Sequence, residues 1–343
     1  MRPKAKFVLR KSVMLSQYTK LEAVSDRVSY SFKSNLEVGK LLEQLTDCDF
    51  SVHSHKTLEL IKDRKRVWLF AQAWDEDEIS ELMRNGVSRF VVDNSKDLDM
   101  LTAFLHKTGK KAELLIRMRL KEHTIHTGKH FVYGMPAEEI NSCIKRLKQD
   151  PNITVLGIHF HRKTQNISEW GLKDELSQTL SPDTLASISI LNIGGGFPVD
   201  YKNSRATTLR NIFDEAMSLK AWLNEKGVKL IVEPGRFIAA PCIELHTTIR
   251  RIYCHNIVVD CSVYNAAIDT FIAHVRLRVR GEGDEGDAYT IKGSTPDSVD
   301  ILRYRVFLKD PKEGDTLIFE NAGAYNFAWQ FCGLEPLPTE VVE

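Results

Sequence analysis

Short apolar runs alternate with longer segments of helical spacing over the first two thirds of the chain. The runs are expected to be strands, and they cover residues 28–32, 50–52, 67–70, 89–92, 112–118, 154–159, 187–192 and 229–232. The helical segments between them cover residues 36–45, 76–85, 95–107, 137–149 and 209–225. Such alternation implies parallel strands joined by right-handed crossovers, in a closed barrel or an open doubly wound sheet. Because eight units fill a closed barrel, the pattern predicts an α/β fold of the (β/α)8 TIM-barrel type.

After about residue 240 the pattern changes to a period of two, which is typical of antiparallel strands. Such runs cover residues 257–259, 273–279 and 316–319, and the Gly-rich acidic stretch 281–287 predicts a hairpin tip. Residues 7–9 precede the first barrel strand and are expected to join this second sheet. The predicted domains are a barrel over residues 14–238 and an antiparallel β-domain built from residues 1–13 and 239–343.

The composition is that of an ordinary globular protein, because 43% of the 343 residues are hydrophobic and 27% are charged. The 47 basic residues balance the 46 acidic ones to a net charge of +1, which argues against a nucleic-acid partner. No run approaches the roughly 20 apolar residues of a membrane span. The basic first residues contain only a short apolar run, so neither a membrane nor a signal peptide is expected.

The six cysteines are scattered and form no C-x-x-C pair: Cys48, Cys143, Cys242, Cys254, Cys261 and Cys332. We therefore expect reduced thiols in a cytoplasmic protein rather than a disulfide framework. No metal site is predicted, because the close pair His159 and His161 has no third ligand in the sequence pattern.

The residues with candidate chemistry follow predicted strands. Lys33 follows the first strand, His161 the sixth, Gly194–Gly196 the seventh, and Glu233 and Arg236 the eighth. In a parallel barrel the carboxyl ends of the strands meet at one rim, where loops vary without disturbing the packed interior. We therefore expect these residues to share one site.

Each of these residues also has a plainer interpretation. A lysine at a strand end is usually a solvated charge, and three glycines can be a loose connector. Glu233 and Arg236 could pair with each other, and His161 could be a core histidine. Together, however, they describe a pocket for pyridoxal 5'-phosphate. In that pocket the lysine forms a Schiff base, the glycines and the arginine hold the phosphate, and the carboxylate keeps the ring nitrogen protonated.

Six ordered segments carry a resemblance to a known family. They are YSFKSN at 30–35, GIHFH at 157–161, GGGFP at 194–198, EPGRF at 233–237, GSTPDS at 293–298 and GAY at 323–325. In order and approximate spacing they resemble the fold-type III pyridoxal-phosphate decarboxylases, the family of ornithine, arginine and diaminopimelate decarboxylases. The resemblance extends over residues 7–327 and implies an alanine-racemase-like fold, in which a barrel is followed by an antiparallel β-domain.

The resemblance implies roles for individual residues. Lys33 would form the Schiff base, Glu233 would pair with the ring nitrogen and His161 would stack on the ring, so these three are the predicted catalytic residues. Arg117, at the end of the fifth strand, matches an arginine near the cofactor. The remaining predicted cofactor-binding residues are Thr164, where the family has Ser, Gly194, Gly195, Gly196, Gly235, Arg236 and Tyr325.

The resemblance also implies a homodimer with shared active sites, because Asp297 would reach into the partner's site. The predicted substrate-binding residues are Asp297, Tyr264 and Cys261, the last standing where ornithine decarboxylases carry an aspartate. Asp260 is one residue away and, in a strand, would point to the opposite face. Where family decarboxylases commonly have a proton-donating cysteine, this chain has Pro296, which leaves Cys261, Tyr264 or a lysine as replacements.

The expected function is pyridoxal-phosphate-dependent decarboxylation of an amino acid. The substrate would be a basic or diamino acid (ornithine, lysine, arginine or diaminopimelate), or a carboxylated polyamine or metallophore precursor. Arg162 and Lys163 would favour a substrate carboxylate if they face the pocket.

Two alternatives stay open: an amino-acid racemase on the same fold, and a non-catalytic regulatory or cofactor-carrying relative. Glu233 favours a decarboxylase over a racemase, since racemases of this fold have an arginine in its place. Retention of Lys33 and of the phosphate residues argues against a non-catalytic protein.

Overall fold

The computed structural model describes residues 4–120, 133–326 and 333–343, and the chain forms two compact units. The barrel unit comprises Tyr18–Phe197 and Thr208–Pro234. The β-unit comprises the N-terminal segment up to Gln17, residues 198–207 and the chain from Gly235 onward. Phe327, at the end of the family resemblance, and Cys332 lie outside the described residues.

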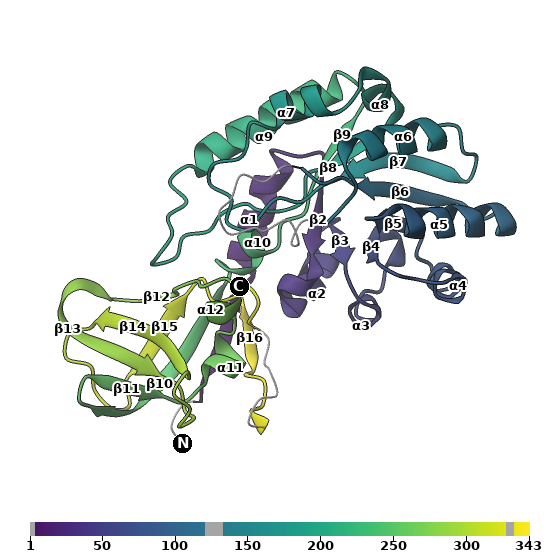
Figure 1. Cartoon of the computed structure of the whole chain (residues 1–343). Coiled ribbons are helices and arrows are strands. Elements are labelled where there is room, and N and C mark those ends of the chain that lie inside the picture. The colour runs from purple at the N-terminus through teal and green to yellow at the C-terminus, as the bar shows by residue number, and fades with distance from the viewer. Residues whose placement is uncertain (1–3, 121–132, 327–332) are drawn as a thin grey trace. The chain divides into compact units, whose positions relative to one another are not determined.

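Parallel strands close the barrel unit, which confirms the predicted fold (Figure 1). In order around the barrel they are β2 (Arg27–Ser31), β3 (Asp49–Val52), β4 (Val67–Ala71), β5 (Arg89–Val92), β6 (Ala112–Arg117), β7 (Ile153–His159), β8 (Ile190–Asn192) and β9 (Lys229–Val232). The last strand pairs with the first, with Arg27 beside Ile231, so the sheet has no free edge. All of the predicted barrel strands are therefore present, with ends that differ by a few residues.

The helices of the barrel unit connect the strands and lie outside them (Figure 1). They are α2 (Leu36–Leu45), α3 (His55–Leu58), α4 (Glu76–Arg84), α5 (Ser95–Thr108), α6 (Ala137–Leu147), α7 (Leu172–Thr179), α8 (Pro182–Ser187) and α9 (Leu209–Asn224), with the 3-10 turns η1 (Phe32–Ser34) and η2 (Arg64–Arg66). The predicted helices correspond to α2, α4, α5, α6 and α9. The others are too short to leave a clear periodic pattern in the sequence. Helix α1 (Lys11–Glu22) carries the chain from the β-unit into the barrel unit.

Local capping signals fix the ends of these helices. At the start of α2, the side chain of Asn35 accepts a hydrogen bond from the Val38 N–H at 3.1 Å. Asp75 and Glu78 form a capping box at the start of α4. Because Asn35 lies two residues after Lys33, its cap also holds the turn that carries the lysine.

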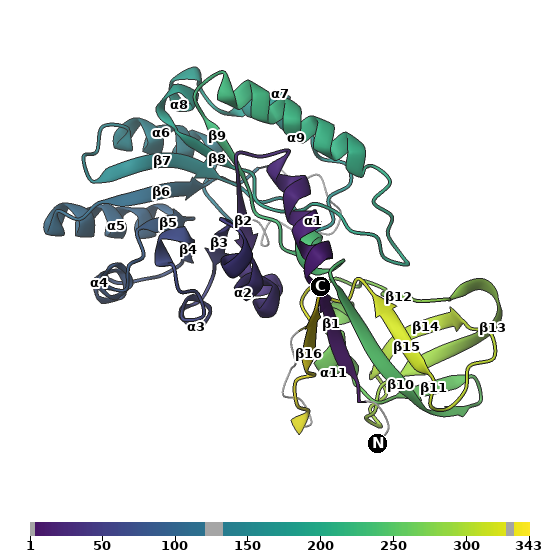
Figure 2. The same ribbon diagram turned by 180° about the vertical axis from the view of Figure 1, so that it is seen from behind.

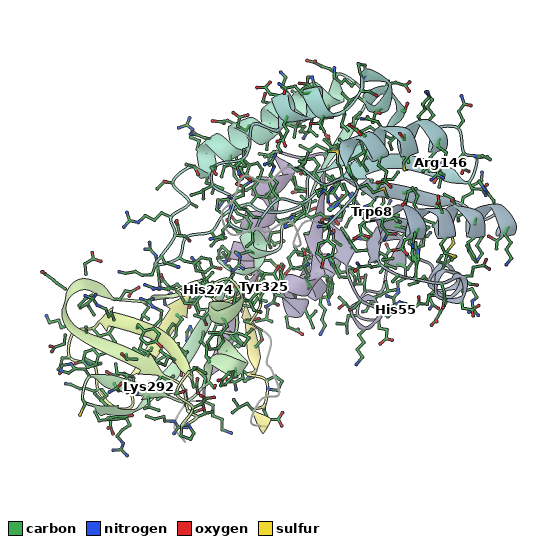
Figure 3. The ribbon with its side chains drawn as sticks, viewed as in Figure 1. His55, Trp68, Arg146, His274, Lys292 and Tyr325 are labelled. Atoms are coloured by element: carbon green, nitrogen blue, oxygen red, sulfur yellow. The ribbon has the colours of Figure 1, made fainter. Side chains whose placement is uncertain are left out.

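The barrel interior is apolar at its centre and charged at the amino ends of the strands. A buried core cluster is formed by Trp68, which is labelled in Figure 3, Val91, Leu115 and Ile231. Below it, the buried Asp49 accepts a hydrogen bond from Arg27 at 2.9 Å and lies 3.4 Å from Arg89. Arg89 also binds Glu113 at 2.9 Å. The charges at this end therefore neutralise one another, and the opposite end carries the candidate site.

The β-unit is built on a largely antiparallel sheet (Figure 2). Its strands are β1 (Lys6–Arg10), β10 (Ile243–Tyr253), β11 (Asn256–Val259), β12 (Arg278–Val279), β13 (Gly283–Lys292), β14 (Ile301–Phe307), β15 (Thr316–Glu320) and β16 (Thr339–Val342), and its helices are α10 (Arg236–Ala239), α11 (Val263–Ala266) and α12 (Asp269–Ile272). As predicted for residues 7–9, β1 joins this sheet, where it lies between β10 and β16 (Figure 2). The pairs β1–β16 and β11–β13 are parallel.

Two predictions for the β-unit are wrong. The run 273–279 is mostly irregular, and only its last two residues form a strand. Its alternation arises because Val275 and Leu277 are buried while Arg276 is exposed, without pairing of the backbone. The acidic stretch 281–287 is not a hairpin tip, since β13 begins at Gly283 and pairs with β14.

Two properties bear on the expected environment of the chain. Among the described residues, no helix combines the length and the apolar character that crossing a membrane requires. The cysteines in the described part of the chain are free thiols: Cys48, Cys143, Cys242, Cys254 and Cys261.

Gly39 in α2 provides a test of how the lysine turn is packed. A Cβ at Gly39 would lie 2.5 Å from Cε2 of Phe32, a fully buried ring next to Lys33. We expect Gly39→Ala to lower the free energy of unfolding by about 1–3 kcal/mol through overpacking, although alanine is the better helix former. Chemical denaturation measures this change. In the control Gly171→Ala, the new Cβ meets nothing within 4 Å and the free energy should hardly change. A Gly39→Ala protein as stable as the wild type would contradict the prediction.

Candidate active site

Lys33 stands on the turn η1, directly after β2. The adjacent Phe32 is buried and packs edge-on against Phe50, with ring centroids 5.6 Å apart. On the other side, the Ser31 N–H donates a hydrogen bond to the Pro234 carbonyl at 3.0 Å. These contacts fix the backbone, while the side chain of Lys33 keeps exposed surface.

The amine of Lys33 has a lowered pKa. The main cause is the protein atoms around the amine, which limit its hydration. The charge of Glu233 opposes this effect, and the charge of Arg117 adds to it. A lower pKa increases the fraction of neutral amine, which is the nucleophilic form.

Glu233, directly after β9, is the centre of a buried hydrogen-bond network. Its Oε1 accepts hydrogen bonds from Ser51 Oγ at 2.7 Å and from Asn192 Nδ2 at 2.8 Å. Its Oε2 lies 3.0 Å from His159 Nε2. Ser51 Oγ in turn lies 2.8 Å from Ser29 Oγ. The three partners come from β3, β7 and β8, and Ser29 adds β2 to the network, so several strands fix the position of one carboxylate.

The network keeps Glu233 ionised. Burial by itself raises the pKa of a carboxyl group, but the interaction with His159 and the hydrogen bond from Ser51 lower the pKa of Glu233 to about 2. Burial also lowers the pKa of His159. The Nδ1 atom of this ring has no hydrogen-bond partner among the described residues. The arrangement fits a neutral His159 that carries its proton on Nε2 and donates a hydrogen bond from this N–H to Glu233.

The glycine run after β8 allows backbone segments to approach closely. Gly194 and Gly196 have φ angles of 67° and 101°, which favour glycine. A Cβ on Gly195 would lie 2.6 Å from the carbonyl oxygen of Glu233. A larger residue at this position would therefore displace the backbone that carries the buried carboxylate.

Two of the three glycine N–H groups already have partners. The Gly194 N–H donates to Asn192 Oδ1 at 2.9 Å, and the Gly195 N–H donates to His161 Nδ1 at 3.1 Å. Within the described part of the chain, Gly196 is the member of the run whose N–H is left for an anion. The run therefore acts mainly through its shape and offers one amide, rather than three, to a ligand.

His161 is oriented by the same contact. Because Nδ1 accepts from Gly195, the neutral ring carries its proton on Nε2. His161 keeps exposed surface, yet the protein atoms packed around it and the charge of Arg117 lower its pKa to about 3. An uncharged ring with an accessible surface is suited to stacking on a flat ligand.

Arg117, the last residue of β6, provides a positive charge at this rim. Its guanidinium carbon lies 5.4 Å from the centroid of the Tyr133 ring, and its Nε has no partner among the described residues. Burial lowers the pKa of Arg117, but arginine remains protonated in proteins. Arg117 is therefore a donor that a ligand oxygen can satisfy.

The basic loop after β7 does not present free charges. Arg162 is buried and binds Glu169 at 3.2 Å and Glu175. Lys163 lies 3.8 Å from Glu169. These pairs do not support the expected attraction of a substrate carboxylate by the two residues. Thr164, in the same loop, is exposed.

In the β-unit, Arg236 is held by a buried carboxylate. Its guanidinium binds both oxygens of Asp269, one of them at 3.1 Å, and donates to Tyr201 Oη at 3.0 Å. The guanidinium carbon of Arg236 lies 5.2 Å from the centroid of the Tyr325 ring. Burial by itself lowers the pKa of a guanidinium, but the hydrogen bonds that Arg236 donates to Asp269 raise its pKa. Gly235 precedes α10, which begins at Arg236.

The loop between β13 and β14 carries Asp297. A backbone hydrogen bond from Val299 and a 2.8 Å hydrogen bond from Tyr264 Oη lower the pKa of this carboxyl group. The loop is held by the buried Asp300, which accepts hydrogen bonds from the Val263 N–H at 2.8 Å and from Thr295 Oγ1 at 2.6 Å. Asp297 is therefore a fixed anion on the surface of the β-unit.

Cys261 does not present its thiol to solvent. It is 1% exposed, its Sγ donates to Thr247 Oγ1 at 3.4 Å, and burial raises its pKa to about 12. This position does not support a role in binding substrate. Asp260 contacts the same Thr247 hydroxyl at 2.7 Å, so the two residues do not lie on opposite faces. The reason is that β11 ends at Val259, and the alternation of a strand does not continue beyond it.

The partners of Glu233 are functional residues with only weak sequence signals. Ser51 and His159 each stand two positions before a candidate residue at the end of a strand. Because side chains alternate between the two faces of a strand, this spacing places them on the inner face of the barrel. Asn192 stands in the same way two positions before Gly194, at the end of β8, whereas Asp269 in the β-unit has no comparable signal.

His53 is a further residue of the rim. It follows β3 as Lys33 follows β2, and the position at a strand end is the signal that identifies it in the sequence. Its ring stacks on Phe70 with centroids 4.4 Å apart and planes 7° from parallel. Phe70 also packs edge-on against His159, the partner of Glu233, so the ring of His53 lies next to the same network.

The stabilising effect of Glu233 is expected to depend on pH. Its pKa of about 2 in the folded chain lies below the value of about 4.3 for an unfolded glutamate. Its contribution is therefore complete above about pH 5 and is lost as the pH falls through about 2. The difference in unfolding free energy between the wild type and Glu233→Gln should shrink from about pH 5 to about pH 3 in urea denaturation. The control Glu37→Gln, on the exposed side of α2, should show no such trend. A difference independent of pH would refute an ionised Glu233.

One protein family matches the chain over the whole barrel. Its sequence model, described as pyridoxal-dependent decarboxylase, pyridoxal binding domain, matches residues 14–240. The diaminopimelate decarboxylase of Aquifex aeolicus is 26% identical over 276 residues, which are 74% of this chain and 64% of that protein. The probable ornithine decarboxylase of Dictyostelium discoideum is 23% identical over 357 residues, 94% of this chain and 75% of that protein. Antizyme inhibitor 2 of Xenopus laevis is 24% identical over 343 residues, 87% and 71% of the two chains. The chain thus spans less than two thirds of the Aquifex protein.

Solved structures share both parts of the fold. The diaminopimelate decarboxylase of Helicobacter pylori complexed with L-lysine has a TM-score of 0.83 at 19% identity, over 99% of this chain and 92% of that one. The lysine/ornithine decarboxylase of Vibrio vulnificus complexed with cadaverine has a TM-score of 0.79 at 21% identity, over 98% and 94%. These likenesses support the fold, and the family match covers more than half of the sequence. The chain belongs to the pyridoxal-dependent decarboxylase family.

Proposed function

We propose that this protein is a pyridoxal-phosphate-dependent decarboxylase of a basic or diamino acid. The observation that carries the proposal is the buried Glu233 carboxylate, which three side chains hold in an ionised state at the barrel rim. Lys33 at the same rim has a lowered pKa, because the limited hydration of its amine outweighs the charge of Glu233, which acts in the opposite direction. A fixed anion near an amine of lowered pKa is what a pyridine aldehyde cofactor requires.

The described residues fit this cofactor. Lys33, whose side chain keeps exposed surface, offers an amine for its aldehyde, and Glu233 offers an anion for its ring nitrogen. The ring of His161 is accessible for stacking, while Arg117 Nε and the Gly196 N–H are donors that no described protein group satisfies. Further proposed cofactor-binding residues, on the family resemblance, are Thr164, Gly194, Gly195, Gly235, Arg236 and Tyr325.

The residues of the barrel then have distinct tasks. When bound, the cofactor supplies a conjugated ring that accepts the electron pair of the broken Cα–carboxylate bond. Glu233 holds a proton at the ring nitrogen, because its own donors keep it ionised and fixed. Lys33 provides the amine that anchors the cofactor, and its lowered pKa favours the neutral form that reacts. His161 covers a face of the ring and excludes water from it.

A substrate with a second amino group suits the charge of the β-unit. Asp297 is an anion fixed by Tyr264, and carboxylates bind alkylammonium groups by charge-assisted hydrogen bonds. The relatives are named for diaminopimelate and ornithine, which also supports a basic or diamino acid. A carboxylated polyamine or metallophore precursor carries the same kind of amine and falls within the proposal.

The proposed active unit is a homodimer in which Asp297 serves the site of the other copy. The β-unit exposes several large apolar side chains, a feature typical of protein interfaces: Phe271, Ile272, Val299 and Tyr304. Val299 lies two residues from Asp297, so the exposed apolar surface includes the same loop.

A racemase and a non-catalytic relative are the competing functions. Glu233 argues against the racemase, because a carboxylate that keeps the ring nitrogen protonated favours full delocalisation of the electron pair. The likeness to a protein named antizyme inhibitor 2 is the observation in favour of a non-catalytic role. Against it stand the reactive Lys33 and the ionised Glu233, which binding alone does not require.

The loaded protein should release CO2 from at least one member of a panel of ornithine, lysine, arginine, diaminopimelate and carboxylated polyamines. Lys33→Ala should abolish both this release and the visible absorption of the lysine-bound cofactor. The control Lys40→Ala removes an exposed lysine of α2 and should change neither. Racemised substrate without CO2 would establish the racemase instead. Cofactor binding with no reaction on any substrate would establish the non-catalytic protein.

Mixing inactive variants tests the shared site. Lys33→Ala and Asp297→Ala chains should each be inactive, whereas random exchange of subunits should restore about a quarter of the activity. The restored activity arises because half of the dimers then contain one complete site. Light scattering verifies that the variants are dimers. Dimers that exchange subunits without any recovery of activity would show that each chain is self-contained.

A further inference from the structure

A decarboxylation consumes one proton at carbon. The carboxylate leaves as CO2, and the electron pair it leaves behind forms a new C–H bond with an added proton, so that an amino acid and H⁺ become an amine and CO2. The site must therefore hold an acid that reaches the substrate and regains its proton from water. This requirement, which rests on the proposed function, can be compared with each titratable group at the barrel rim.

Most of these groups do not meet the requirement. Glu233 is an anion whose oxygens accept three hydrogen bonds, and its partner His159 is 1% exposed. Arg117 does not release a proton in proteins. His161 uses Nδ1 to accept from Gly195 and is expected to stack through its face. Lys33 and His53 remain, and of these two His53 is the one without another task in the proposed reaction.

His53 combines exposure with a fixed position. It is exposed, and no hydrogen bond occupies its ring nitrogens within the described residues. Its ring stacks on Phe70, and Phe70 in turn packs edge-on against His159, with centroids 5.0 Å apart and planes at 81°. The chain of rings joins His53 to the partner of Glu233. Its plane is therefore set while both nitrogens stay available to a ligand and to water.

The charges that face His53 come from four elements of the barrel. They are Lys33 on η1, Arg117 on β6, His159 on β7 and Glu233 after β9. Although His53 keeps exposed surface, the protein atoms packed around its ring and the charge of Lys33 lower its pKa to about 3, so the ring is neutral before a ligand binds. An anionic cofactor and a substrate carboxylate offset the positive charges of Lys33 and Arg117, which raises the proton affinity of the imidazole.

We propose that His53 is the acid that transfers a proton from solvent to the substrate carbon that loses its carboxylate. One N–H bond of its imidazolium breaks, and the proton forms the C–H bond with the electron pair left by CO2. The neutral imidazole then takes a proton from water through its exposed edge. Pro296, which has no proton to donate, is not needed in this step.

The variant His53→Phe tests this assignment, because it retains a flat ring against Phe70 and removes both nitrogens. The cofactor-loaded variant should bind cofactor as the wild type does, while formation of the amine falls about 100-fold or more. In D2O the wild type should place deuterium on one face of the carbon, and the variant should lose this stereochemical preference. The control is His55→Phe, on the nearby helix α3 (Figure 3), which should leave rate and stereochemistry unchanged.

A second measurement does not depend on turnover or on a variant that folds. NMR titration of the labelled His53 ring in the wild type should show a pKa that rises when pyridoxal phosphate binds. A pKa that stays unchanged on loading overturns the proposal.

The outcomes separate this proposal from the one on which it rests. A His53→Phe protein with the wild-type rate and stereochemistry shows that another group, such as Lys33, is the acid, and the proposed decarboxylase remains. A wild type that releases no CO2 from any substrate overturns both.

Discussion

The buried carboxylate of Glu233 is the constraint on which the rest of the site depends. An unpaired charge in a barrel interior would cost several kcal/mol, so the carboxylate requires donors on every side. Ser51, Asn192 and His159 supply them from three strands. The main chain is equally fixed, since the Glu233 N–H donates to the Gly194 carbonyl at 2.7 Å. The position of one side chain is thereby tied to the closure of the whole barrel.

The two ends of the barrel treat charge in opposite ways. At the amino ends of the strands, Asp49 is shared by Arg27 and Arg89, so the charges there are paired. At the carboxyl ends, Arg117 Nε has no hydrogen-bond partner in the described part of the chain, and Lys33 keeps exposed surface. Polar groups that lack a hydrogen-bond partner in the protein contribute most to the free energy of binding when a ligand supplies that partner. Because the charges at the amino ends are paired with one another, the carboxyl ends remain available for binding. This arrangement is typical of the fold, in which one end contributes stability and the other carries the site.

Charged residues near the sequence motifs differ in how far their side chains are available to a ligand. Arg162 is paired with Glu169 and Glu175, and Arg236 is held in its orientation by Asp269. Both arginines are buried, and an arginine in such pairs is a positioned group rather than a diffuse positive charge. The near-zero net charge of the chain thus conceals several local balances, each of which sets whether a side chain can reach a ligand.

The sequence by itself determined the barrel, because parallel strands and their helices are recorded in local periodicity. It also located Lys33, His161, the glycine run and Glu233, since residues at strand ends occupy predictable places on the rim. It did not identify the donors around Glu233 or the pairing of Arg162.

Only the tertiary structure decided those pairings. They join residues far apart in the chain, such as Ser51 and Glu233, and no local pattern records which side chains closure of the sheet will bring together. The thiol of Cys261 illustrates the same limit, because its burial depends on how the chain turns after β11 ends. Periodicity reports which face of an element is buried, whereas hydrogen-bond geometry depends on atoms that meet only after the elements have packed.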